Sequence, residues 1–269
     1  MSVIFRTFSV LAVLVLSQLC VHAQNGTAVQ TGDTLESVMR KSEPSYGLPE
    51  DEFHLRQLIL PSALITFGVA GVKSSGNAGL KRDWQLAMAG LRGENYCYID
   101  NYMQYVPIVM ELGCGIFDKR AKHGFIDRAL LSATATVVFL YMDVPLKNFL
   151  EEKRPDSGTE DSFPSGHTAT AFMGAELVRS EYPLGYGIAA YTFAVGVAFL
   201  RTYNDRHWIN DVIAGAGIGI LSARIAHWLL PIEKKLLSYD ERQKKQQVFV
   251  APAYDTRTKA FGLTCNITF

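Results

Sequence analysis

The sequence lacks an excess of charge of either sign, because 26 basic and 26 acidic residues leave a formal net charge of zero. It has no basic stripe or basic low-complexity arm, which argues against nucleic acid as a partner. Its four cysteines show no metal-ligand spacing. If the first 23 residues are removed, Cys97, Cys114 and Cys265 remain and allow at most one disulfide within the chain. No metal site is therefore predicted.

Long hydrophobic runs are also scarce. A membrane-spanning helix needs about 20 apolar residues, and residues 184–200 come closest, with no formal charge between Leu184 and Leu200. The other apolar stretches are shorter or carry Asp143, Arg224 or His227, and runs of about 10 to 14 residues are more often buried core. We expect an exported helical bundle that associates with the membrane, with the number of spans left open.

The N-terminus is typical of an export signal. Arg6 forms a short basic region, residues 9–19 form an apolar core, and a small residue, Ala23, precedes the expected cleavage site at Gln24. The alternative is a first transmembrane helix, for which the apolar run is short. We therefore predict a signal peptide over 1–23, an N-terminal arm over 24–56, a helical catalytic domain over 57–231, and a charged helix end with an extended tail over 232–269.

Six apolar stretches predict an all-α bundle of about six core helices. They are rich in Ala, Gly, Leu and Val, which favours helix over strand, and they cover 58–72, 105–117, 129–142, 168–178, 184–200 and 209–230. Alternation of apolar and polar residues occurs only near the end, where Val248–Val250 and Phe261–Leu263 predict a short β-hairpin or extended tail.

Two cations lie near the end of the third stretch. Lys147 and Arg154 are seven residues apart, which would place both on one face of a helix. Pro155 disfavours helical geometry at Arg154 and would end the helix there. The two side chains could then meet an anion beside the helix end. The alternative is an ordinary solvated face, because charged residues lie between them.

A second motif, Pro164-Ser165-Gly166-His167, precedes the apolar stretch that begins at residue 168. Unpaired backbone N–H groups at a helix N-terminus attract anions, and Gly166 allows close approach to the backbone. Ser165 adds a hydroxyl donor, and His167 would stand beside the anion to protonate a leaving oxygen. A serine-hydrolase reading is disfavoured because Gly-x-Ser-x-Gly is absent.

The third motif runs from Arg201 to Asp211. We expect Asn204 or Asp205 to cap a helix that contains both His207 and Asp211, which at i and i+4 would share a face. Asp211 could then hold one ring nitrogen and leave the other free to attack phosphorus. Arg201 would offer a bidentate donor to the phosphate. The alternative is a surface ion pair of little energetic value.

Together the motifs read Lys-x6-Arg-Pro, Pro-Ser-Gly-His and Arg-x5-His-x3-Asp. The chain resembles the type 2 phosphatidic acid phosphatase (PAP2) family, which shares its site with bacterial class A acid phosphatases and vanadium haloperoxidases. The resemblance covers 147–211 by motif, and about 58–230 by helical pattern. One position departs: Leu200 stands where the family usually has serine, which removes a hydroxyl that could support Arg201.

The resemblance implies a metal-independent phosphatase with an all-helical fold. It implies that His207 forms a phosphohistidine, that Asp211 orients His207, and that His167 protonates the leaving alcohol and then helps to activate water. It implies phosphate-binding roles for Lys147, Arg154, Ser165, Gly166 and Arg201. No cofactor is implied, although vanadate could occupy the site as a phosphate mimic.

The expected substrate is a lipid phosphomonoester or diphosphate of the cell envelope: phosphatidate, phosphatidylglycerophosphate, a polyprenyl diphosphate or a lipid A phosphate. The active site would face the periplasm. The sequence leaves open a soluble periplasmic acid phosphatase of broad specificity and, with lower weight, a vanadium-dependent haloperoxidase. A non-enzymatic helical scaffold would require every charged position in the three motifs to be incidental.

Overall fold

The structure is a computed structural model, and it describes residues 53–73, 78–117, 120–237, 247–255 and 260–268. Contacts divide the chain into residues 1–48 and 49–269, and every described residue belongs to the second unit. The predicted signal peptide and almost all of the predicted arm lie outside the described residues. Those two assignments therefore stay predictions.

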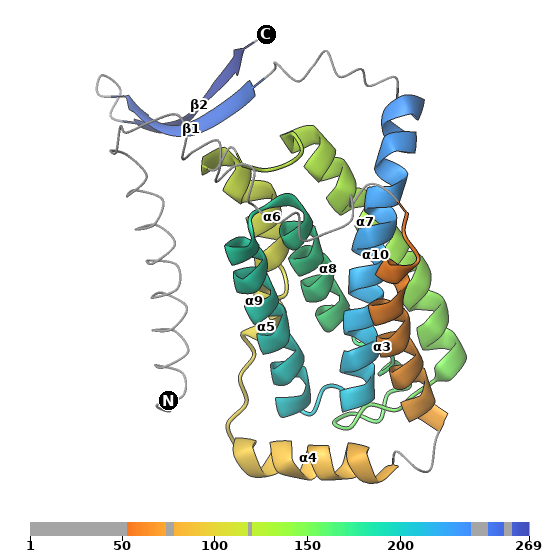
Figure 1. Cartoon of the computed structure of the whole chain (residues 1–269). Helices are drawn as coiled ribbons and strands as arrows, with labels where there is room; N and C mark the ends of the chain where they lie inside the picture. Colours follow the sequence, from red (N-terminus) through yellow and green to blue (C-terminus); the bar gives the residue numbers. More distant parts are fainter. Residues whose placement is uncertain (1–52, 74–77, 118–119, 238–246, 256–259, 269) are drawn as a thin grey trace, which may run out of the picture. The chain divides into compact units, whose positions relative to one another are not determined.

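The described part of the long unit contains eight helices and one pair of strands (Figure 1). The helices are α3 (Arg56–Lys73), α4 (Ala78–Arg92), α5 (Asp100–Met103), α6 (Val106–Phe117), α7 (Phe125–Leu150), α8 (Gly166–Glu181), α9 (Leu184–Tyr203) and α10 (Ile209–Leu236). The predicted all-α bundle is confirmed, and the six apolar stretches become α3 and α6 to α10 in chain order. Sequence reasoning did not identify α4 and α5. The first is amphipathic rather than apolar throughout, and the second is only four residues long.

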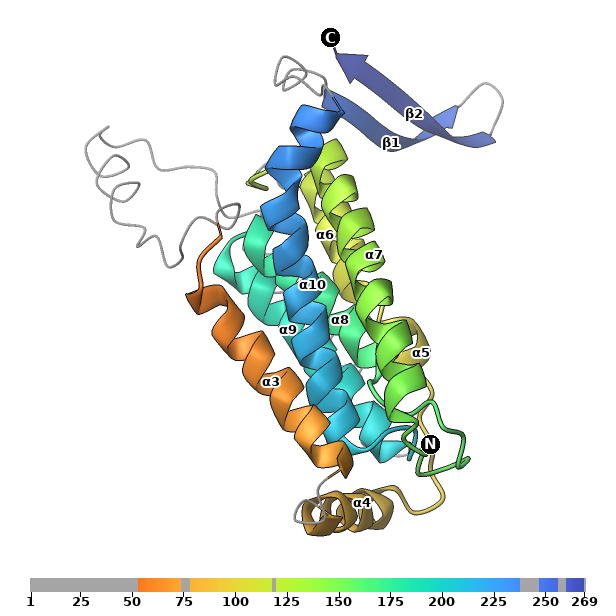
Figure 2. The ribbon, with the colours of Figure 1, turned by 90° about the vertical axis from the view of Figure 1, so that its right-hand side faces the viewer.

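Helix α8 is the central helix of the bundle, packed against α6, α7, α9 and α10 (Figure 1). One face of α8 buries Met173 and Leu177 against Leu131 of α7 and Ile218 of α10. The opposite face packs small residues against α9 and α6. Helix α3 lies along α10, as Figure 2 also shows. Burying apolar area on both faces of α8 fixes its N-terminus within the bundle.

Glycines bring α8 and α10 unusually close together. A Cβ added at Gly219 would overlap the backbone of α8 at Ala169, and one added at Gly215 would lie 2.6 Å from the Ser165 carbonyl oxygen. Only a residue without a Cβ permits this approach. The contact at Gly215 also positions the start of α8, where the second sequence motif lies.

Two local predictions about helix ends are wrong. Helix α7 ends at Leu150, because Glu151 adopts a left-handed conformation (φ 45°, ψ 42°), so Arg154 lies in the following loop and not on the face of Lys147. Helix α10 begins at Ile209 with Trp208 as its N-cap, so His207 precedes the helix. His207 and Asp211 therefore do not meet as neighbours on one helical face.

Within the part of the chain that the structure describes, three helices are long and apolar enough to cross a membrane: α7, α9 and α10. The predicted stretch 129–142 extends to 26 residues in α7 and the stretch 209–230 to 28 residues in α10. Many large apolar side chains on these helices are exposed, among them Val137, Tyr141, Leu184 and Val195. An apolar exterior of this kind suits contact with lipid and supports membrane association.

The predicted C-terminal hairpin is present. Strand β1 (Gln247–Asp255) pairs antiparallel with β2 (Ala260–Thr268), with Gln247 opposite Thr268 and Asp255 opposite Ala260.

Candidate active site

The residues singled out by the three motifs gather at one end of the bundle, on the side where α4 crosses it (Figures 1 and 2). The C-terminal ends of α7 and α9 and the N-terminal ends of α8 and α10 meet there. The 151–165 loop connects α7 to α8 across this end. Helix termini therefore supply most of the site, and α4 and α5 cover its rim.

Lys147 lies in the last turn of α7 and points at the start of α8. Its Nζ donates to the Pro164 carbonyl oxygen at 2.5 Å and pairs with Asp143 Oδ1 at 3.2 Å. Asp143 is buried. The ammonium group is thus held by one carboxylate and one carbonyl beside the second motif.

Arg154 is held by the loop that carries it. Its Nε and Nη2 donate to the two oxygens of Asp161 at 2.9 and 2.8 Å, a bidentate pair. Thr159 Oγ1 also donates to Asp161, at 2.6 Å, and this hydrogen bond followed by the pairing with Arg154 lowers the pKa of Asp161. A bidentate carboxylate resembles the way in which a phosphate would engage the same guanidinium. Asp161 therefore engages the same donors that a phosphate would need.

The second motif forms the N-terminus of α8. Ser165 is the N-cap residue of α8 and is fully buried. Its backbone N–H donates to the Asp211 carbonyl oxygen at 3.1 Å, and its hydroxyl oxygen lies 3.0 Å from Thr168 Oγ1. Gly166 and His167 are the first two residues of the helix. Backbone N–H groups in the first turn have no intrahelical acceptor, so this terminus can receive an anion.

Arg201 is a buried cation with a buried partner. It lies in the last turn of α9, 5% exposed, and its Nη1 donates to Asp100 Oδ2 of α5 at 2.8 Å. Asn204 donates to the other oxygen of Asp100 at 3.3 Å. One edge of the Arg201 guanidinium is therefore fixed by α5. Its Nε has no hydrogen-bond partner among the described residues, which leaves donor capacity for a ligand.

His207 is buried, with 2% of its surface exposed, and the charges of all three cations act on it. Burial lowers its pKa well below the usual value, and the charges of Arg201, Arg154 and Lys147, in that order, lower it further. The ring is therefore neutral at pH 7, as a nucleophile must be. Its Nδ1 lies 2.8 Å from the Ser162 carbonyl oxygen. A carbonyl only accepts, so Nδ1 carries the hydrogen and Nε2 holds the free lone pair.

Asp211 lies near His207 without being its closest partner. Its Oδ2 is 3.6 Å from His207 Nδ1, which is beyond hydrogen-bonding distance. Oδ2 instead accepts hydrogen bonds from the Ser162 hydroxyl at 2.5 Å and from the Trp208 N–H at 3.0 Å. Asn210 Nδ2 donates to Oδ1 at 3.0 Å. The carboxylate is thus fixed by three donors and acts on His207 through its charge.

His167 lies across the site from this group. Its Nε2 is 3.1 Å from Asn101 Oδ1 of α5. Burial and then the charge of Arg201 lower its pKa to about 4, whereas Asp100 opposes this shift. The ring is therefore neutral at pH 7. A bound phosphate dianion offsets the cations and favours the protonated form that a general acid needs.

The structure thus brings together all eight residues that the motifs indicated, although their roles stay predictions. It also adds participants that sequence reasoning missed. Asp100 and Asn101 come from a four-residue helix without a recognisable pattern, and Glu152 and Ser162 come from the loop after α7. No local sequence signal links them to the motifs, because the contacts depend on tertiary packing. Among the described residues no group of three or more His, Cys, Asp or Glu side chains is arranged to hold a metal ion.

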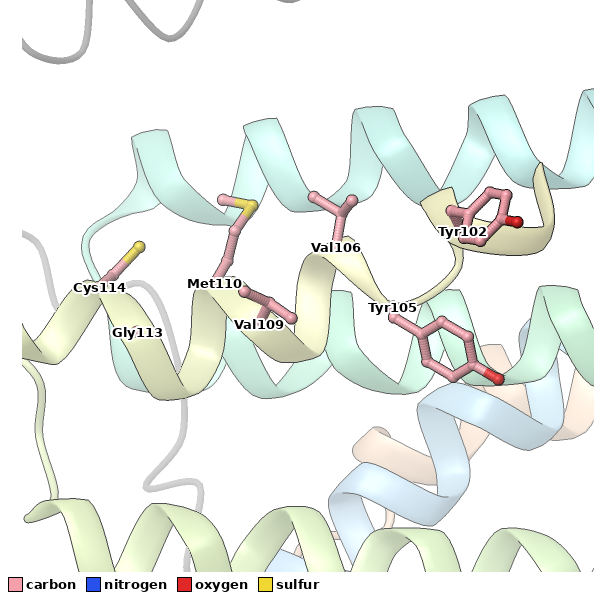
Figure 3. Close-up of a pocket in the computed structure, with 7 residues that line it drawn as sticks. All are labelled: Tyr102, Tyr105, Val106, Val109, Met110, Gly113 and Cys114. Carbon is pink, nitrogen blue, oxygen red and sulfur yellow. The ribbon is translucent and has the colours of Figure 1, made fainter. Parts of the chain in front are cut away.

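An apolar groove of about 370 Å³ runs along α6 (Figure 3). Val106, Met110 and Cys114 form a row on one side of α6, and Tyr102 of α5 stands at the end nearest the site. Tyr102 directly follows Asn101, which contacts His167. The remaining lining residues are Tyr105, Val109 and Gly113.

A buried neutral histidine, three nearby cations and a helix N-terminus form a candidate oxyanion site in a helical bundle. Residues 128–235 match the sequence model of the PAP2 superfamily. Helices α3 to α6 precede the matched segment.

Two curated relatives are similar to parts of the chain. A lipid A 1-phosphatase of Porphyromonas gingivalis is 33% identical over 141 residues, which cover 51% of this chain and 32% of the relative. The bacitracin transport permease protein BcrC of Bacillus licheniformis is 32% identical over 91 residues, 32% of this chain and 44% of the relative. The chain therefore spans less than half the length of each.

Two solved structures are also similar. LpxE of Aquifex aeolicus has a TM-score of 0.41 and 23% identity, covering 52% of this chain and 92% of that one. A transmembrane PAP2-type phosphatidylglycerolphosphate phosphatase of Bacillus subtilis has a TM-score of 0.47 and 20% identity. The match covers 66% of this chain and 97% of that one.

Proposed function

We propose that the protein is a metal-independent phosphatase that hydrolyses a lipid phosphomonoester or diphosphate through a phosphohistidine at His207. The observation that carries the proposal is that one buried histidine lies in a site where the charges of Lys147, Arg154 and Arg201 all act on it. Phosphoryl transfer develops charge on the equatorial oxygens, and fixed cations stabilise that charge. Sequence similarity to a lipid A 1-phosphatase supports a phosphorylated lipid as the substrate class.

In the first step, His207 Nε2 attacks phosphorus and the bond to the leaving alcohol oxygen breaks. His167, protonated while the dianion is bound, gives its proton to that oxygen. The two N–H groups at the start of α8, the Ser165 hydroxyl and the three cations hold the nonbridging oxygens. The ring of His207 becomes cationic, and Asp211 stabilises it from 3.6 Å.

In the second step, water attacks the phosphohistidine and the P–N bond breaks. The now neutral His167 takes a proton from the attacking water, so the ring returns to its protonated form. His207 leaves as a neutral imidazole, with its Nδ1 hydrogen still directed at the Ser162 carbonyl. Release of inorganic phosphate restores the starting state.

The apolar groove on α6 supports a lipid rather than a small soluble ester. A phosphate at the start of α8 would place the attached alcohol near α5, and an acyl chain could then lie against the row of Val106, Met110 and Cys114 (Figure 3). The three long apolar helices support membrane association. We further propose that the site faces the periplasm. Labelling of a cysteine placed at exposed Ser157 by an impermeant reagent in intact spheroplasts tests this.

The central experiment measures phosphate release by purified protein in EDTA. The panel holds phosphatidate, phosphatidylglycerophosphate, undecaprenyl diphosphate, lipid A and p-nitrophenyl phosphate. We expect release from at least one lipid, and complete loss in His207→Ala, because no other side chain replaces the nucleophile. An acid-labile phosphoryl adduct should be trapped on the wild type only.

Three results would contradict the proposal. Activity that survives in His207→Ala but disappears with chelator would indicate a metal enzyme. A preference for the soluble ester, with protein released by osmotic shock without detergent, would favour a soluble acid phosphatase. Peroxide-dependent halogenation after vanadate is added would indicate a haloperoxidase.

A further inference from the structure

Behind the candidate nucleophile lies a buried polar layer that the three motifs do not include. Glu152, in the loop after α7, is 8% exposed and forms a close ion pair with Lys81 of α4. Its other oxygen accepts from Asn210 Nδ2 at 3.0 Å. The same amide nitrogen donates to Asp211 Oδ1 at 3.0 Å. Glu152 and Asp211 are therefore two carboxyl groups that share one donor.

This arrangement is electrostatically unfavourable without a cation. Two carboxylates in a site sheltered from water repel each other, and one of them tends to hold a proton. Burial and then Asp211 raise the pKa of Glu152 to about 7, whereas Lys81 acts in the opposite direction. The titratable groups that face the carboxyl pair are Lys81 from α4, which is charged, and His207 from the loop before α10, which is neutral until it is phosphorylated.

Lys81 is built into this position and is not a loose surface lysine. Its side chain is 15% exposed, its Nζ lies 5.2 Å from the centre of the Trp208 ring, and it reaches the Gly71 carbonyl oxygen at 3.4 Å. Gly71 packs directly on Asn210, where an added Cβ would lie 2.7 Å from the Asn210 Cβ. The N-terminal part of α4 is thus fitted against the polar layer by α3 and Trp208.

From this geometry we propose that Lys81 and Glu152 are positioning residues of the phosphate-transfer site. Lys81 lets Glu152 and Asp211 carry charge together, so that Asp211 stays ionised behind His207 while the ring becomes cationic. The inference rests on the proposed phosphatase reaction. Lys81 lies outside the segment that matches the PAP2 superfamily, so this chain supplies the cation from its own N-terminal helices.

The sign of the pH effect follows from the carboxyl pair. As pH falls, the pair takes up one shared proton, the negative charge behind His207 decreases and the reaction slows. Removing Lys81 makes the pair easier to protonate, so this loss should begin at higher pH. Removing the charge of Glu152 leaves a single carboxylate, which needs no neighbouring cation.

The test compares kcat against pH for the wild type, Lys81→Met, Lys81→Arg, Glu152→Gln and the double variant Lys81→Met/Glu152→Gln. In Lys81→Met we expect the acidic limb to move up by about one pH unit, equivalent to a tenfold change in proton affinity, with KM nearly unchanged. Lys81→Arg keeps the charge and should keep the wild-type limb. The double variant should follow Glu152→Gln, because the group that needs the lysine is gone.

The outcomes separate this inference from the proposed function. An active wild type whose profile superimposes on that of Lys81→Met overturns the inference alone. The inference is also overturned if the loss of kcat in the double variant equals the product of the losses in the two single variants. It is overturned as well if Lys81→Met loses kcat equally at all pH values and has a lower melting temperature. A wild type that releases no phosphate from any substrate overturns the proposed function, and the inference with it.

Discussion

Replacement of Asp211 by asparagine separates two ways in which this carboxylate could serve His207. In a Ser-His-Asp triad the aspartate fixes the tautomer of the histidine, and the corresponding asparagine variant loses about 10⁴-fold in kcat. Here Nδ1 of His207 lies 2.8 Å from the Ser162 carbonyl oxygen and 3.6 Å from Asp211. The backbone therefore sets the tautomer, and Asp211→Asn leaves that backbone in place.

What the substitution removes is charge. Coulomb's law at an effective dielectric constant of about 20 gives about 4.6 kcal/mol for unit charges 3.6 Å apart. If roughly half a unit of charge has developed on the ring in the transition state, the loss is about 2 kcal/mol, or about 30-fold in kcat. The Ser162 hydroxyl and the Trp208 N–H can still donate to the amide oxygen, so the side chain keeps its place.

The assay is phosphate release at saturating substrate, with KM measured alongside. Ser162→Ala is the matched control, because it removes the hydroxyl that contacts Asp211 and keeps the carbonyl that contacts His207; it should lose far less than Asp211→Asn. A loss near 10⁴-fold in Asp211→Asn would refute the argument, since the carboxylate would then set the tautomer. A loss below about threefold would refute the electrostatic role as well.

Three further predictions follow from the site and the helix packing. Asp161→Asn frees Arg154 for phosphate, so KM should fall by up to about fivefold at constant kcat, because partly exposed ion pairs are worth about 1 kcal/mol or less. An unchanged KM argues against competition between Asp161 and the phosphate for Arg154. Gly219→Ala should cost about 1–3 kcal/mol of stability by overpacking α8 against α10, seen as a lower melting temperature that Gly185→Ala, in open space, does not share. Because the pKa of His167 is about 4, binding of tungstate at pH 6 should be accompanied by uptake of a proton. Calorimetry in two buffers of different ionisation enthalpy measures this uptake, and His167→Asn should not show it.

Much of the helical framework could be predicted from the sequence, because apolar residues recur along each core helix. The six apolar stretches correspond to α3 and α6 to α10. The helix that crosses the site could not be predicted in the same way, because α4 buries only part of its surface. Helix ends also escaped prediction: the left-handed Glu151 shortens α7, and Trp208 starts α10 one residue after His207. Backbone conformations at such positions depend on contacts with the rest of the fold.

The sequence by itself determined which side chains are available for phosphate chemistry, because three short motifs carry the histidines, the cations and the glycine. Only the tertiary structure decided how these groups are held. It pairs Arg201 with Asp100, Arg154 with Asp161 and His207 with the Ser162 carbonyl, and it brings Lys81 to the carboxyl pair behind the nucleophile. The physical reason is that burial makes charges dependent on specific partners. Those partners come from segments distant in the sequence, which only packing of the helices brings together.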